Sequence, residues 1–200
     1  MKRIMCLVVI AALAALPALA SVRLLNLGYN IWTAGEAGFS MQSVGLVYTC
    51  KTGDTAGFYM QVTPHLPLRI TSGPSVYDLL ESGERGGGLM LTLGAGTDVR
   101  LAGFGVVVGG GLLVNAVVLA IPGGYVFDGY DIWGNGAVGA GGGVHLYFQP
   151  RGGSFLVNFG VDAAWRPLVI QGYTSHYSPE SSFQPRNWNI NINAGIGCRK

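Results

Sequence analysis

Residues 187–197 of this chain read Asn-Trp-Asn-Ile-Asn-Ile-Asn-Ala-Gly-Ile-Gly. From Trp188 to Ile196 every second residue is apolar, and the residues between them are asparagine or glycine. Successive side chains of a β-strand point to opposite faces, so this spacing predicts a strand with one apolar and one polar face. The same alternation runs through 154–169 and 56–70. The chain is therefore predicted to be all-β.

Eight strands are predicted along the chain, at 22–33, 38–50, 56–70, 87–95, 100–118, 135–149, 154–169 and 187–198. Most of them reach the ~9–11 residues that a tilted strand needs to cross a bilayer. Gly, Pro and Asp predict tight turns at 51–54, 96–98 and 150–153. Longer connections alternate with these turns, at 71–86, 119–134 and 170–186, after a short first loop at 34–37. The pattern predicts an eight-stranded antiparallel transmembrane β-barrel with external loops and periplasmic termini.

The N-terminal segment has the three parts of a secretory signal peptide. Lys2 and Arg3 supply the positive charge, the run 4–16 is apolar, and small residues follow it. The apolar run is shorter than the ~20 residues of a membrane-spanning helix. We therefore expect 1–20 to be a cleaved signal peptide and 21–200 to form a single outer-membrane barrel domain.

The composition indicates an exterior that faces lipid. Charged residues make up 11% of the chain, whereas a soluble domain carries roughly 25%. The formal net charge of +2 leaves no large basic surface, so nucleic acid is not expected as a partner.

Two alternatives for the fold stay open at this point. The uncharged stretch 101–126 has the hydropathy of a transmembrane helix, although its many glycines and valines favour a strand. A soluble exported barrel of lipocalin type would turn the apolar face inward to hold a lipid.

The polar positions of the predicted strands identify side chains that line the lumen. They are Asn26, Asn30, Tyr59, Gln61, Thr63, His65, Arg69, Asn115, His145, Tyr147, Asn158, Asp162 and Arg166. An eight-stranded barrel is only just wide enough for its side chains to fill, so a hydrogen-bonded network that plugs it is the simplest role for them.

No catalytic or metal-binding motif is apparent. The histidines lack zinc-ligand spacing, so no metal or other cofactor is expected. No Ser-His-acid arrangement stands out, so we expect no enzyme, with a lipid-modifying outer-membrane enzyme as the alternative. Six acidic residues fall in the three long external loops that are predicted: Asp78, Glu81, Glu84, Asp128, Asp131 and Glu180. Surface solvation accounts for them, and binding of divalent cations is the open alternative.

Cys50 and Cys198 are predicted to remain unbridged, although disulfides can form in an export compartment. In a closed barrel the strand at 22–33 lies between the strands that carry them. Two strand spacings put their Cα atoms at least ~9.5 Å apart, and a disulfide needs less than ~7 Å.

The carboxyl end, from Asn191 to Lys200, is similar to the final strand of the small eight-stranded outer-membrane barrels, the OmpW-like and OmpA-like families. These families usually close with a Gly-Tyr-Arg-Phe type of ending. Here Cys198 stands in place of the aromatic residue and Lys200 in place of the terminal Phe. The mature length resembles the OmpW-like family more. That resemblance implies a narrow apolar-lined passage for small hydrophobic compounds, whereas OmpA-like relatives are chiefly structural or adhesive.

Three functional hypotheses follow. The first is a narrow pore or transport barrel for small solutes, including hydrophobic ones. The second is a membrane-anchored adhesin or binding module whose external loops contact host or envelope ligands. The third is the soluble lipocalin-like lipid binder. For the first two, the expected partners are outer-membrane lipid and the barrel-assembly machinery.

Overall fold

The computed structural model describes residues 20–34, 39–72, 75–79, 85–127, 130–151, 153–174 and 187–200. Within these residues the chain forms nine β-strands. They are β1 (Ala20–Ala34), β2 (Phe39–Thr52), β3 (Ala56–Ser72), β4 (Ser75–Asp78), β5 (Arg85–Leu101), β6 (Phe104–Phe127), β7 (Tyr130–Phe148), β8 (Phe155–Thr174) and β9 (Asn187–Arg199).

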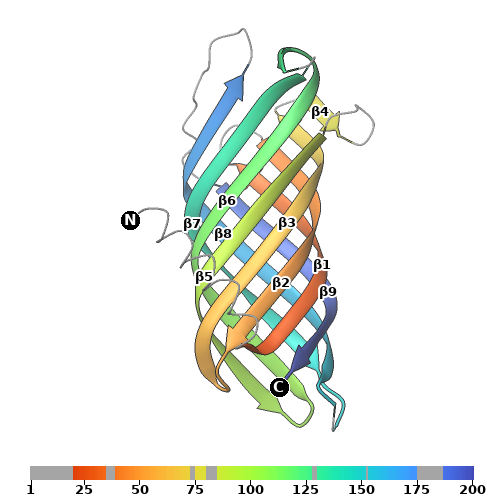
Figure 1. Ribbon diagram of the computed structural model, residues 1–200, viewed down its shortest axis with the longest axis vertical. Helices are drawn as coiled ribbons and strands as arrows, with labels where there is room; N and C mark the ends of the chain where they lie inside the picture. Colours follow the sequence, from red (N-terminus) through yellow and green to blue (C-terminus); the bar gives the residue numbers. More distant parts are fainter. Residues whose placement is uncertain are drawn as a thin grey trace.

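Eight of these strands close into an antiparallel barrel. β1 pairs with both β2 and β9, and a contact between β2 and β3 completes the ring. The short β4 forms a hairpin with the end of β3, whereas the stretch of β3 from Ala56 to His65 pairs with β5. One end of the barrel carries the short turns and the C-terminus (Figure 1). We call it the turn end, and the opposite end the loop end.

The eight predicted strands are confirmed, but one predicted turn is wrong. The turn was expected at 96–98, yet β5 continues through these residues, and Asp98 pairs with Val107 of β6. The hairpin turns instead at Ala102 and Gly103, whose φ angles are 46° and 95°. Two-residue hairpin turns with positive φ match the twist of the flanking strands, which explains why the chain turns there.

The loop end is more regular than the sequence suggested. The predicted loop at 119–134 is mostly strand, because β6 reaches Phe127 and β7 begins at Tyr130. The predicted loop at 71–86 contains β4. The helix alternative for 101–126 is wrong, since β6 pairs with β5 on one side and β7 on the other. No helix among the described residues is long and apolar enough to cross a membrane.

The two faces of the barrel have opposite polarity. Large apolar side chains are exposed on the outside of every barrel strand, for example Leu27, Leu46, Leu66, Leu89, Leu112, Val144, Phe159 and Ile192. The interior instead buries many asparagine, aspartate and arginine side chains. The soluble lipocalin-like alternative does not fit, because it needs the apolar face inside.

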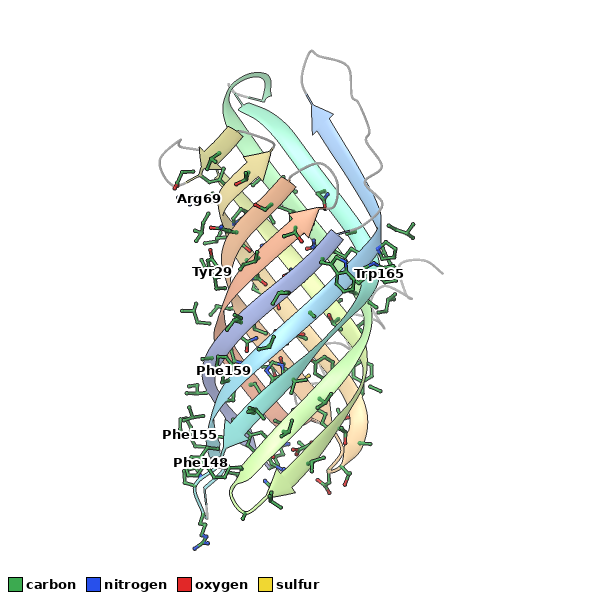
Figure 2. All side chains as sticks on the ribbon, turned by 180° about the vertical axis from the view of Figure 1, so that it is seen from behind. Tyr29, Arg69, Phe148, Phe155, Phe159 and Trp165 are labelled. Carbon is green, nitrogen blue, oxygen red and sulfur yellow. The ribbon has the colours of Figure 1, made fainter. Side chains whose placement is uncertain are left out.

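Aromatic pairs lie on the outer surface near both ends of this apolar band. The ring centroids of Trp165 and Trp188 are 6.4 Å apart, towards the loop end. Those of Phe104 and Phe148 are 5.1 Å apart, towards the turn end. Figure 2 shows Trp165 and Phe148 at these two levels, with Phe159 between them. Aromatic girdles at both interfaces are typical of transmembrane barrels.

The positions of the cysteines confirm the predicted strand order. Arg23 of β1 pairs with Cys50 of β2 on one side and with Cys198 of β9 on the other. A whole strand therefore separates the two cysteines, and both thiols are free in the structure.

Substituting Ile192→Arg is expected to lower the free energy of unfolding in lipid by about 2–4 kcal/mol, because an arginine near the middle of the apolar band loses its hydration. Leu101→Arg, at the turn end of the same surface, is the matched control and is expected to cost about 0–1 kcal/mol. Urea titration of the chain folded into phospholipid vesicles measures both losses. Equal losses would contradict the membrane orientation of the barrel.

Candidate functional site

The interior of the barrel holds nearly all of the predicted lumen residues. The structure buries Asn26, Asn30, Tyr59, Gln61, Thr63, His65, Asn115, His145, Tyr147, Asn158, Asp162 and Arg166. Several inward-facing polar residues that were not predicted join them: Ser43, Thr49, Lys51, Thr92, Asp98, Asn135, Asn189, Asn191, Asn193 and Arg199. Most of the second set alternate with outward side chains along their own strands, as Asn189, Asn191 and Asn193 do with the apolar residues of β9, and this alternation is the signal that could have identified them.

Arg69 is the exception, and its assignment to the lumen is wrong. Its side chain is exposed, and Figure 2 shows it on the outer surface near the loop end. The pairing of β2 with β3 shifts there, because Gln42 pairs with Arg69 whereas Ser43 pairs with Pro67. The extra residue is a β-bulge, and a one-residue shift moves every later side chain to the other face. Arg69 instead lies 3.5 Å from Asp78.

The structure describes two of the six acidic residues assigned to external loops. Asp78 lies in β4, and the backbone of Asp131 lies in β7 rather than in a loop. Glu81, Glu84, Asp128 and Glu180 lie outside the described residues. Among the described residues, no three side chains of His, Cys, Asp or Glu gather as they would around a metal ion.

A buried ion pair lies at the turn end of the interior. Arg199 Nη1 is 2.6 Å from Asp98 Oδ2, and the Tyr147 hydroxyl donates to Asp98 Oδ1 at 2.7 Å. Arg199 also donates to the Tyr147 oxygen, at 2.9 Å. A buried carboxylate is stable only when it is paired and hydrogen-bonded in this way. This pair was not predicted from the sequence, because Asp98 was expected in a turn.

An apolar cluster fills the lumen next to this ion pair. Its members come from several strands and are all buried: Val22, Leu24, Tyr59, Val107, Tyr147 and Leu156. The Tyr59 ring lies against Gly109, where any Cβ would overlap the ring atoms. Glycine at this position therefore makes room for a large side chain that crosses the lumen.

A hydrogen-bonded network occupies the middle of the barrel. His145 Nε2 is 3.1 Å from Asp162 Oδ1, and the Asn193 amide donates to Asp162 Oδ2 at 2.7 Å. Asn26 and Asn158 donate to each other at 2.7 and 2.9 Å. Asn26 also donates to Asn193, at 2.5 Å. The hydrogen bonds join β1, β8 and β9 across the interior, and the contact of His145 with Asp162 adds β7.

The free space beside this network is small. A cavity of about 20 Å³ is lined by residues that include Gln61, Met90, Leu113 and Asp162. A single water molecule needs about 10–15 Å³, so this cavity has room for about one water. The middle of the barrel is therefore a packed interior.

The loop half of the interior has a different character. The guanidinium carbon of Arg166 lies 3.7 Å from the ring centroid of Trp32, close enough for a cation–π interaction. Trp32 belongs to a buried apolar cluster with Met41, Leu79, Val117 and Leu119, and Ile70 packs against it. Leu79 follows β4, and its backbone N–H donates to the Leu68 carbonyl at 2.9 Å. β4 thus brings an apolar side chain to the mouth of the barrel.

Comparisons with protein-family models and with curated protein sequences find no match for this chain. Among solved structures, Neisserial surface protein A (NspA) is similar with a TM-score of 0.55 and 8% identity, over 90% of this chain and 96% of that one. A major outer membrane protein of Thermus thermophilus gives a TM-score of 0.47 and 16% identity, over 88% of this chain and 99% of that one. Ail, the attachment invasion locus protein of Yersinia pestis, gives a TM-score of 0.47 and 11% identity, over 89% of this chain and 99% of that one.

At these identities the similarity to NspA concerns the fold alone. The more specific resemblance to OmpW-like proteins stays a prediction. The chain has the fold of a small outer-membrane β-barrel, with eight antiparallel strands closed into a ring.

Proposed function

We propose that this chain is a bacterial outer-membrane protein whose barrel is a closed membrane anchor and whose loop end is a binding surface. The observation that carries this proposal is the packed turn half of the lumen. There the apolar cluster around Tyr59 and the Asp98–Arg199 ion pair fill the interior from several strands. A pore for small solutes, which the sequence also favoured, would require these side chains to move apart.

The outer surface supports the membrane location. The apolar band runs around the barrel, with aromatic pairs towards each end. A soluble protein rarely exposes so large a continuous apolar surface, whereas a transmembrane barrel presents such a surface to lipid. Outer-membrane lipid and the barrel-assembly machinery are therefore the expected general partners.

The loop end offers an extended platform for a ligand. Within the described residues, the pairing of β5 with β6 ends at Ala120 and that of β9 with β8 ends at Arg166. Beyond these points β6 continues to pair with β7 as far as Tyr130, and β7 pairs with β8 as far as Ile132 and Thr174. Figure 1 shows the three strands rising beyond the rest of the barrel. We propose that a host or envelope ligand binds this platform.

We propose no enzymatic activity. His145 and Asp162 form the pair most similar to a catalytic one, but both are buried inside the network. A catalytic histidine must reach its substrate, and a membrane lipid meets only the outer surface of the barrel.

If the turn half is closed, liposomes that contain the chain are expected to pass arabinose no faster than protein-free liposomes. Replacing Tyr59 and Tyr147 together by alanine removes two rings from the apolar cluster and is expected to open a measurable flux. Tyr29→Ala, on the outer surface, is the matched control and is expected to leave the liposomes tight. Rapid flux through the unsubstituted chain would favour the pore instead.

The proposed orientation predicts which residues are accessible on intact cells. A peptide epitope inserted between residues 127 and 130 is expected to bind antibody on intact cells, because β6 ends and β7 begins at the loop end. The same epitope inserted after Arg151, at the turn end, is expected to be labelled only after the outer membrane is permeabilised. Labelling in the reverse order would place the platform in the periplasm and contradict the proposal.

A further inference from the structure

Arg166 is a buried cation whose charge has no partner among the described residues. Its side chain is fully buried, and none of its three guanidinium nitrogens has a hydrogen-bond partner. Among the described residues, its guanidinium group contacts the face of the Trp32 ring. Asp162 lies four residues earlier on β8 but is engaged with His145 and Asn193.

This arrangement contrasts with the other buried charges of the barrel. Asp98 and Arg199 form an ion pair, and Lys51 donates to the carbonyl oxygens of Gly53 and Asp54. A cation in a water-poor interior is costly unless an anion or several acceptors offset the lost hydration. Unsatisfied buried polar groups in native structures are few, and a bound ligand is one of their recognised explanations.

The surroundings of Arg166 contain further polar atoms without partners. Both polar atoms of the Asn30 amide lack a hydrogen-bond partner, as does the amide oxygen of Asn189. Asn30 lies two residues before Trp32 on β1, and Asn189 pairs with Trp32 across the β1–β9 contact. The interior around Trp32 therefore contains the unpaired positive charge of Arg166 and the amide atoms of Asn30 and Asn189 that have no hydrogen-bond partner.

The loop-end side of this part of the interior is apolar. Met41 pairs with Trp32, and Val117 and Leu119 project inward from β6 beyond Asn115. Consider a ligand that reaches Arg166 from the loop end with its charged group first. The rest of that ligand would contact this apolar cluster. A small inorganic anion would leave these apolar contacts unused.

We propose that the loop half of the barrel binds an amphiphilic organic anion, whose carboxylate or phosphate group pairs with Arg166 and whose apolar body lies against the cluster of Trp32, Met41, Leu79, Val117 and Leu119. Guanidinium forms strong paired hydrogen bonds with both kinds of headgroup. The site is separate from the platform of β6, β7 and β8, and it does not depend on which side of the membrane the loop end faces.

The test uses the chain purified from cell membranes in a nonionic detergent, with Trp133, Trp165 and Trp188 replaced by phenylalanine so that Trp32 alone fluoresces. The probes are 2-bromododecanoate and 2-bromododecyl phosphate, whose bromine lies beside the headgroup and quenches a tryptophan on contact. We expect saturable quenching by at least one of them, and the stronger probe identifies the headgroup. Arg166→Met is expected to weaken the binding at least tenfold, whereas Arg69→Met, on the outer surface, leaves it unchanged.

Two further measurements test whether the negative charge of the probe is needed for binding. The neutral 2-bromododecanol is expected to bind at least tenfold more weakly than the anions. If Arg166→Met fails to fold, Arg166→Gln replaces it, and the anions but not the alcohol are expected to raise the temperature at which the unsubstituted barrel unfolds. Equal quenching with and without Arg166, no saturable binding, or binding of inorganic phosphate as tight as that of the amphiphiles would each overturn the proposal.

Discussion

The structure depends on the closure of the backbone hydrogen-bond ladder into a ring. Inside a bilayer no water is available to an unpaired N–H or C=O group, so a sheet with free edges is not stable there. The pairing of β1 with both β2 and β9 removes the last edge of this barrel. Once the ring is closed, each strand has one face towards lipid and one towards the lumen. Each side chain then points to one or the other.

Closure with eight strands also limits the space inside. The lumen of such a barrel is filled by its own side chains, so each large inward residue needs a small one opposite. Tyr59 lies against Gly109, and any Cβ on Gly143 would overlap the Asp162 carboxylate. Glycines in this barrel therefore make room for a tyrosine and for a buried acid. A ligand must then bind in the loop half of the barrel or on the platform beyond it.

The buried charges divide the interior into two halves. In the turn half and the middle, Asp98 is paired with Arg199, and Asp162 lies against His145 and Asn193. These contacts tie distant strands together and stabilise the closed state. In the loop half, Arg166 has only the Trp32 ring as a described partner. This difference indicates that the two halves serve different purposes, one for stability and the other for recognition.

The alternation of apolar and polar residues was enough to predict the strands, their two faces and the closed ring, because both the pleat and the lipid–lumen division repeat every two residues. It placed Asn26, His145 and Asp162 inside correctly. Arg69 faces outward because of a bulge, and a bulge depends on the register with β2, which no single strand encodes. The partners of Asp98 and Arg166 likewise came only from the tertiary structure, since closure of the ring decides which side chains meet across the lumen.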